Sequence, residues 1–270
     1  MTAALPDITC TTIIGHDLDL LRWCVENTRA RAGLPHQWLV VNWIPADRPE
    51  AAAPIEAWCR QEGICYVPYQ GEPRPADPAA STGWFLRQLY ACWNLGYAKA
   101  DTKWVARMGS DQFFNQNWLA NLMKAADKFG ERAVYHCWTV ESPIAKNSRH
   151  EIRPWGTTWA EMDVKRFDQY AADLAHRYSG ERALRTADCN LRYRHPHRGL
   201  QLRPDGCSWL QLRSLWEEFG PLDDVVNAEG VTGDVAYMDR LYDAGVKGFL
   251  VPPSTTYHLV KGESRDIQQN

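Results

Sequence analysis

The chain has 270 residues, of which 45% are hydrophobic, and it carries a formal net charge of −3. This composition supplies a large core with no sign of overall disorder, and the slightly acidic balance argues against a general nucleic-acid binder. No apolar run approaches the ~20 residues that span a bilayer, and the first residues lack the regions of a signal peptide. We therefore expect a cytoplasmic protein, either free or attached peripherally to a membrane.

Strands and helices are predicted to alternate through the first half of the chain, from apolar periodicity and turn residues. The predicted strands, rich in apolar and β-branched residues, are 8–14, 38–43, 64–67, 104–108 and 133–140. The predicted helices, with apolar residues at helical spacing, are 17–32, 54–62, 82–98 and 117–129. Prolines predict an exposed loop over 70–81. This alternation predicts an α/β fold with a mostly parallel sheet flanked by helices.

The second half of the chain interrupts this rhythm. Residues 141–203 hold one predicted helix, 163–178, within irregular sequence that is rich in arginine and histidine from 177 to 203. This basic segment has two interpretations: a patch that binds phosphates or an anionic acceptor, or a solvated surface. Afterwards the predicted elements, in chain order, are a strand at 207–210, helices at 211–219 and 234–244, and a strand at 249–251.

The most informative segment runs from Asn94 to Asp111. It contains a helix end, a short turn and the buried strand 104–108, and Gly109 and Ser110 then lead to Asp111. In open α/β sheets, ligands bind at the carboxyl ends of the strands. A carboxylate there suits a divalent cation or a ligand hydroxyl. The alternative is that Asp111 only caps the next helix.

The pattern of Asn94, Gly96, Ala100 and Asp111 resembles the centre of GT-A-type glycosyltransferases, particularly the family 2-like group. In that family the strand ends in a D-x-D or S-D motif, which holds a metal ion against the diphosphate of a sugar nucleotide. This chain departs from the full motif, because Gly109 stands where the first carboxylate usually lies.

Further segments resemble the same family in the same order. Residues 206–224 are similar to the apolar strand, helix and G-G-F-D-E segment, and residues 233–245 are similar to the E-D helix. Residues 256–259 resemble the late strand whose histidine can complete the metal site. The likeness covers about residues 8–140 and 205–262.

The resemblance implies one GT-A (Rossmann-like) domain over 1–270, in which 1–111 binds the nucleotide sugar. The acceptor would be bound by 112–270, which includes an irregular and helical insert at 141–205. The donor would be a nucleotide-diphosphate sugar, with a UDP sugar favoured. The acceptor would be a glycan or another hydroxyl-bearing molecule, including an anionic one.

The resemblance and the residue chemistry together assign roles. Asp111 and His258 would bind Mn²⁺ or Mg²⁺, and Asp234 would be the general base of an inverting transfer. The residues expected near the donor are Ile14, His16, Asn42, Arg87, Asn94, Ser110 and Asp111. The residues expected near the acceptor are Trp209, Arg213, Asp223 and Asp224.

Each assignment has an alternative. Asp234 follows a glycine and could be an ordinary helix N-cap, and the pair Asp223–Asp224 competes with it for the role of base. His258 could be a core histidine, and Asn42 could begin a turn. The missing carboxylate at Gly109 also leaves open a catalytically inactive module that binds a glycan or a partner. A sugar-phosphate nucleotidyltransferase fits less well, since residues 14–19 offer one glycine where a phosphate loop needs several.

Overall fold

The computed structural model describes residues 7–44, 46–145, 151–178, 192–195, 199–202, 208–223 and 233–259. The strands of its main sheet are β1 (Ile8–Ile14), β2 (Gln37–Ile44), β3 (Cys65–Gln70), β4 (Trp104–Arg107), β5 (Gln112–Phe114), β6 (Ala133–Glu141), β7 (Glu151–Ile152), β10 (Trp209–Leu212) and β11 (Lys247–His258). The α-helices are α1 (Leu18–Arg31), α2 (Ala52–Gln61), α3 (Pro78–Lys99), α4 (Trp118–Phe129), α5 (Val164–Arg177), α6 (Arg213–Phe219) and α7 (Gly233–Asp243).

The nine strands form one sheet in the order β3-β2-β1-β4-β10-β6-β11-β5, with β7 beside β6. Strands β3, β2, β1 and β4 are parallel to one another, and β11 is parallel to β6. Strand β10 is antiparallel to both β4 and β6, and β5 is antiparallel to β11. The predicted mostly parallel α/β sheet is therefore confirmed.

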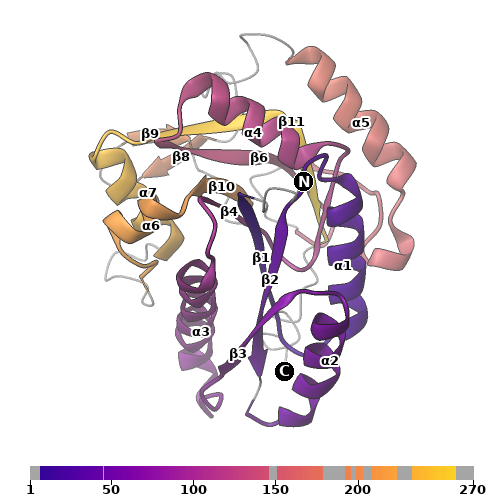
Figure 1. Cartoon of the computed structure of the whole chain (residues 1–270), viewed down its shortest axis with the longest axis vertical. Helices are drawn as coiled ribbons and strands as arrows, with labels where there is room; N and C mark the ends of the chain where they lie inside the picture. Colours follow the sequence, from indigo (N-terminus) through magenta and orange to yellow (C-terminus); the bar gives the residue numbers. More distant parts are fainter. Residues whose placement is uncertain are drawn as a thin grey trace, which may run out of the picture.

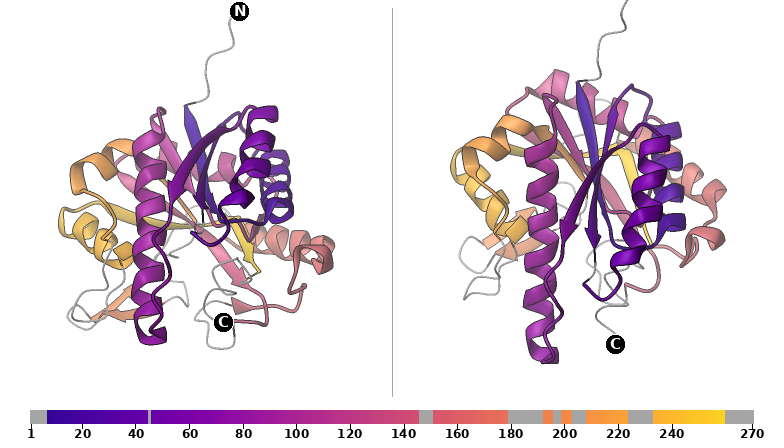
Figure 2. Two further views of the ribbon diagram at one scale, coloured as in Figure 1. Left: turned by 90° about the horizontal axis from the view of Figure 1, so that it is seen from below. Right: turned by 60° about the horizontal axis from the view of Figure 1, so that its bottom comes forward.

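Helices cover both faces of the sheet (Figure 1; Figure 2). One core layer joins the sheet to α1, α2 and α4, and the other joins it to α3, α6 and α7. In Figure 2, the long helix α3 lies on one side of the strands, together with α6 and α7, opposite α1 and α2. The protein therefore has the three-layer arrangement in which ligands bind at the carboxyl edge of the strands.

Three features differ from the sequence prediction. Strand β5 was not predicted, because its three residues are too short to show alternation. Strand β11 runs for 12 residues, with an irregularity between Val251 and Thr255 where two prolines lack backbone donors. The predicted irregular and helical insert also contains a two-stranded antiparallel sheet of β8 (Arg192–His195) and β9 (Gly199–Leu202), besides α5.

The 3₁₀ helices lie at Pro49–Ala51 and Trp159–Glu161. The longest α-helix, α3, begins at Pro78, earlier than predicted, because proline suits the first turn of a helix, where its missing N–H costs no bond. Within the described residues, no helix is both long enough and apolar enough to cross a membrane.

Candidate functional site

Asp111 lies in the turn that joins β4 to β5. The turn is shaped by the Gly109 N–H, which donates to the side-chain oxygen of Gln112 at 2.7 Å. Asp111 is buried, with 7% of its surface exposed, and the partly exposed Ser110 precedes it. The next helix, α4, is preceded by Asn117 as its N-cap residue. The interpretation of Asp111 as a helix cap is therefore wrong, because a strand follows this aspartate.

His258, at the end of β11, faces Asp111. Residue 258 pairs with Gln112 across the antiparallel β5–β11 ladder, and the Leu259 N–H donates to the Asp111 carbonyl at 3.0 Å. This register places Nε2 of His258 3.2 Å from Oδ2 of Asp111. The resemblance had grouped these two residues as metal ligands, and the structure brings them together.

Glu141 completes the cluster from the other side of the imidazole. It is the last residue of β6 and the register partner of His258 on β11. Its Oε1 lies 3.2 Å from Nδ1 of His258. Sequence reasoning missed Glu141, although it carries a signal similar to that of Asp111, a carboxylate that closely follows the apolar residues of a buried strand.

The two carboxylates control the charge of His258. Burial alone would lower the pKa of the imidazole, but Asp111 and Glu141 outweigh that effect and raise the pKa to about 10. Without another cation, the imidazole is therefore protonated at neutral pH and donates to both carboxylates.

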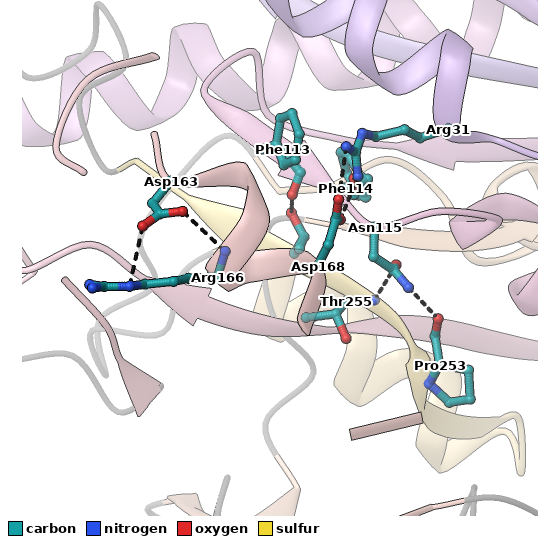
Figure 3. A network of polar contacts seen from close by, with 10 residues as sticks. Arg31, Phe113, Phe114, Asn115, Asp163, Arg166, Asp168, Pro253 and Thr255 are labelled. Atoms are coloured by element: carbon teal, nitrogen blue, oxygen red, sulfur yellow. Dashed lines mark hydrogen bonds and ion pairs between the residues drawn. The ribbon is translucent and has the colours of Figure 1, made fainter. Parts of the chain in front are cut away.

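Figure 3 shows contacts that fix β5, which follows Asp111, and β11, which carries His258. The Asn115 side chain accepts from the Thr255 N–H at 2.8 Å and donates to the Pro253 carbonyl at 2.9 Å, which ties the end of β5 to β11. The Arg31 guanidinium forms a bidentate pair with Asp168 at 2.6 and 3.1 Å and reaches the Phe114 carbonyl at 3.4 Å. Helices α1 and α5 thus hold β5 in place.

The donor set of this cluster fits a divalent metal that takes part of its coordination from substrate. Mn²⁺ and Mg²⁺ accept carboxylate oxygens and commonly keep phosphate and water ligands. Asp111 and His258 offer one oxygen and one nitrogen at a spacing compatible with a shared ion. Among the described residues, no group of three or more His, Cys, Asp or Glu side chains is arranged to hold a metal by itself. A bound ion would need ligands from elsewhere, such as a diphosphate.

Asp234 occupies the second position of α7. Its Oδ1 accepts a hydrogen bond from the Tyr90 hydroxyl of α3 and another from the Val235 N–H, both at 3.0 Å. The preceding Gly233 is needed for close packing, because a Cβ there would lie 2.0 Å from the Asp223 carbonyl oxygen. The first turn of a helix favours an ionised carboxylate. The Asp234 carboxylate is thus held at the start of α7 by Tyr90 and Val235, and its role as a base stays a prediction.

The predicted donor residues on β1 and β2 are packed inside the protein. Ile14 is buried at the end of β1, and its carbonyl accepts from the Asn42 side chain at 3.0 Å. Asn42 also donates to the Gly15 carbonyl at 2.6 Å and accepts from the Tyr66 hydroxyl at 2.9 Å. The Asn42 amide therefore joins the ends of β1 and β2, and any contact of that amide with a base stays a prediction.

The other predicted donor residues are dispersed. The ring of His16 lies 3.3 Å from the Arg48 guanidinium, and Arg87 lies 3.9 Å from Glu72. Asn94 has a structural partner, because its amide donates to the Leu222 carbonyl at 2.9 Å and accepts from the Leu222 N–H at 2.8 Å. This pair of bonds fixes the segment that follows α6 onto α3.

The structure does not bring the predicted acceptor residues together. Trp209 is 1% exposed and donates to the Tyr97 hydroxyl at 2.7 Å. Arg213 lies at the amino end of β4, opposite the end that leads to Asp111, since it donates to the Ala100 carbonyl at 2.9 Å. An acceptor contact at Arg213 is therefore not supported.

Asp223 forms an ion pair with Arg240 of α7 at 2.8 Å. This ion pair holds the segment after α6 against α7. The Asp223 carboxylate therefore has a structural partner, which does not favour it as the base. Asp224 lies outside the described residues. So do most of the arginines and histidines of the basic segment 177–203, and its two interpretations stay open.

No protein-family model matches the chain, and no curated protein matches its sequence. Its structure is similar to solved GT-A-type glycosyltransferases. One is GalNAc-T7 with UDP, GalNAc and Mn²⁺, with a TM-score of 0.53 and 12% identity over 95% of this chain and 44% of that chain. Another is the mannosyltransferase PcManGT from Pyrobaculum calidifontis with GDP-Man and Mn²⁺, with a TM-score of 0.54 and 12% identity over 97% of this chain and 59% of that one.

A third similar structure is S. aureus TarS 1-349, with a TM-score of 0.52 and 10% identity over 93% of this chain and 60% of that one. In these comparisons this chain matches 44%, 59% and 60% of the other chains. At such identities the likeness concerns the fold. The chain has the GT-A fold of glycosyltransferases.

Proposed function

We propose that this protein is a metal-dependent glycosyltransferase that moves a sugar from a nucleotide-diphosphate sugar to an acceptor hydroxyl. The observation that carries the proposal is the Asp111–His258 pair, at 3.2 Å, after the carboxyl end of β4 in a GT-A fold. Two similar structures, GalNAc-T7 and PcManGT, contain Mn²⁺ with UDP or GDP-Man, which supports a nucleotide-sugar donor. In the proposal, residues 1–111 bind that donor and residues 112–270 bind the acceptor.

Asp111 and His258 would hold the metal through Oδ2 and Nε2. We propose Mn²⁺ ahead of Mg²⁺, because imidazole ligands suit transition metals better than Mg²⁺. A bound divalent ion neutralises the negative charge that develops on the departing diphosphate. Since His258 must lose its Nε2 proton to become a ligand, Glu141 would keep the remaining proton on Nδ1 and hold the ring in orientation.

Asp234 would accept the proton of the acceptor hydroxyl as that oxygen attacks the anomeric carbon. The hydrogen bond from Tyr90, at 3.0 Å, holds the carboxylate in one orientation. Direct attack assisted by one base gives inversion at the anomeric carbon.

The experiment that tests this function combines nucleotide binding with turnover. UDP, GDP, CDP and TDP are titrated with and without Mn²⁺, and thermal unfolding is followed for the wild type, Asp111→Ala and His258→Ala. The exposed Asp19→Ala serves as the matched control. We expect one nucleotide to raise the midpoint only with Mn²⁺, and both site variants to lose that response, because a ligand stabilises the state that binds it.

Turnover decides between the enzyme and an inactive binding module. Hydrolysis or transfer of the matching sugar nucleotide supports the enzyme. Metal-dependent nucleotide binding without any turnover would favour the inactive module, an alternative motivated by Gly109. No nucleotide response in the wild type would contradict the donor site itself.

A further inference from the structure

A row of register partners crosses four neighbouring strands on the face of the sheet that α3 covers. Thr11 of β1 pairs with Arg107 of β4, Arg107 pairs with Trp209 of β10, and Trp209 pairs with His136 of β6. Paired residues on adjacent strands point to the same face. The row therefore places a guanidinium beneath α3, in a layer that is otherwise mainly apolar and aromatic.

Arg107 is the buried cation of this row, with 4% of its surface exposed. Its guanidinium carbon lies 4.2 Å from the ring centroid of Trp209 and 4.5 Å from that of Trp93 on α3. The indole faces attract the cation, but they do not accept conventional hydrogen bonds from its N–H groups.

Two of the three guanidinium nitrogens of Arg107 are buried without a hydrogen-bond partner. These are Nε and Nη1; the Oγ1 of Thr11, the register partner of Arg107 on β1, is also buried without a hydrogen bond. In the described part of the chain, no carboxylate forms an ion pair with Arg107. Because an arginine stays charged in proteins, it cannot relieve this burial by losing a proton. A buried cation with unused donors calls for an anion or for water.

The location of Arg107 relates it to the proposed base, Asp234. Arg107 is the last residue of β4, and the turn that carries Asp111 follows it in the chain. Trp93, which contacts it, lies one turn along α3 from Tyr90, and Tyr90 holds Asp234. The turn before Asp111 contacts the opposite layer, because the Cys24 thiol of α1 donates to the Gly109 carbonyl at 3.6 Å. Arg107 therefore belongs to the layer of Asp234.

We propose that Arg107 binds an anionic group, a carboxylate or a phosphate, on the molecule whose hydroxyl reacts beside Asp234. The guanidinium would supply charge-assisted hydrogen bonds from its unused donors, and Trp93 and Trp209 would exclude water around them. The acceptor-side assignment rests on the proposed function, whereas the anion site itself rests only on the burial and the unused donors of Arg107.

The first test uses simple anions as probes. Inorganic phosphate and acetate are titrated at constant ionic strength into the wild type, Arg107→Met and Arg107→Lys, and thermal unfolding is followed. Arg132→Met is the matched control, since Arg132 is an exposed arginine paired with Glu218. We expect a saturable rise in midpoint for the wild type and for Arg132→Met, a weaker rise for Arg107→Lys, and none for Arg107→Met.

Without added anion, we expect Arg107→Met to be at least as stable as the wild type, because an apolar side chain of similar length relieves an unpaired buried charge. Two results would overturn the proposal: no saturable response of the wild type to either anion, or an equal response in Arg107→Met. Strong destabilisation of Arg107→Met together with no anion response in the wild type would assign Arg107 to packing alone. The stronger of the two probes identifies the group as phosphate or carboxylate.

The second test separates the acceptor from the donor. UDP with Mn²⁺ is titrated into the wild type and Arg107→Met, and we expect unchanged affinity. A tenfold or greater loss would assign the guanidinium to the donor diphosphate and overturn the acceptor-side placement. If the wild type binds phosphate or acetate through Arg107 but binds no nucleotide, the proposed function fails while the anion site stands.

Discussion

Nε2 of His258 lies 3.2 Å from Oδ2 of Asp111, although the two residues are far apart in the sequence. The contact depends on one short strand, β5, which pairs antiparallel with β11 and brings position 258 opposite position 112. Because Glu141 lies 3.2 Å from the other ring nitrogen, the imidazole joins two carboxylates. In the metal-free protein the imidazole is protonated between two anions, whereas in the proposed function a neutral imidazole would bind the metal.

The first prediction concerns the stability of the metal-free protein. The pKa of His258 is about 10 in the folded state, against an ordinary value of 6.5. A pKa raised by folding stabilises the protein fully below the unfolded value, and the effect is lost as the pH rises through the folded value. We expect the free energy of unfolding, measured with urea and a chelator, to fall between pH 7 and pH 10.

The control for this prediction is His258→Gln, which removes the titrating group. Its free energy of unfolding should be lower than that of the wild type at pH 7, and the two curves should converge towards pH 10. Parallel curves for the two proteins would show that the imidazole is not charged between the carboxylates.

The second prediction concerns Glu141 as the residue that orients His258. Outer hydrogen-bond partners of metal-bound histidines typically contribute about 10- to 100-fold to metal affinity. We expect Glu141→Ala to weaken Mn²⁺ binding by that amount, and Glu141→Gln to weaken it less, since its amide oxygen still accepts from Nδ1. The dissociation constant of Mn²⁺ in the presence of the matching nucleotide diphosphate can be measured by electron paramagnetic resonance, with Glu56→Gln, at a residue that lies in an ion pair with Arg60, as control. Equal affinities in all four proteins would remove Glu141 from the metal site.

The third prediction uses two glycines of one helix. A Cβ at Gly96 in α3 would lie 2.7 Å from Thr11 Oγ1, whereas the nearest atom to a Cβ at Gly83 is 4.0 Å away. Gly83→Ala should stabilise the protein by about 0.5–1 kcal/mol, the usual gain within a helix. Gly96→Ala should instead destabilise it by about 1–3 kcal/mol, because the helix must move away from β1. Urea unfolding of both variants measures the difference, and the same sign for both would contradict the close packing.

Local sequence patterns predicted the fold well where strands are long and apolar. Strand β1 has the predicted limits, Ile8–Ile14, and β4 begins at the predicted Trp104. The sequence also predicted that Asp111 follows a buried strand, because the strand before it is apolar and ends at a glycine. The end of β11 was less clear, because the prolines at 252 and 253 suggest the end of a strand. Pairing with β6 nevertheless resumes at Thr255, which extends the strand to His258.

Contacts between distant strands could not be predicted from local pattern. Glu141 joins the site only because β11 lies beside β6 in one particular register, which is a property of the whole sheet. Arg107 was read as one residue of an apolar strand, and its surroundings come from Trp93 and Trp209, far away in the chain. Asn94 and Arg213 show the opposite outcome: residues expected near a ligand hold the backbone of Leu222 and Ala100.

The last prediction compares the proposed base, Asp234, with Tyr90, whose hydroxyl donates a hydrogen bond to it. Asp234→Asn should lower the rate of transfer by about 100- to 10,000-fold, the usual contribution of a general base. Nucleotide affinity should stay within about twofold, a difference worth less than 0.5 kcal/mol. Tyr90→Phe removes only the hydroxyl that donates to Asp234 at 3.0 Å, so we expect a smaller loss of rate and the same nucleotide affinity.

Measuring kcat and the nucleotide dissociation constant for both variants distinguishes the role of Asp234 from a general loss of structure. The matched control is Asp239→Asn, in the same helix as Asp234 but beyond its first turn. Full activity of Asp234→Asn would move the base to another carboxylate. Weakened nucleotide binding in Asp234→Asn would instead show that the start of α7 supports the donor, because removing a base from the reacting hydroxyl leaves the affinity for nucleotide unchanged.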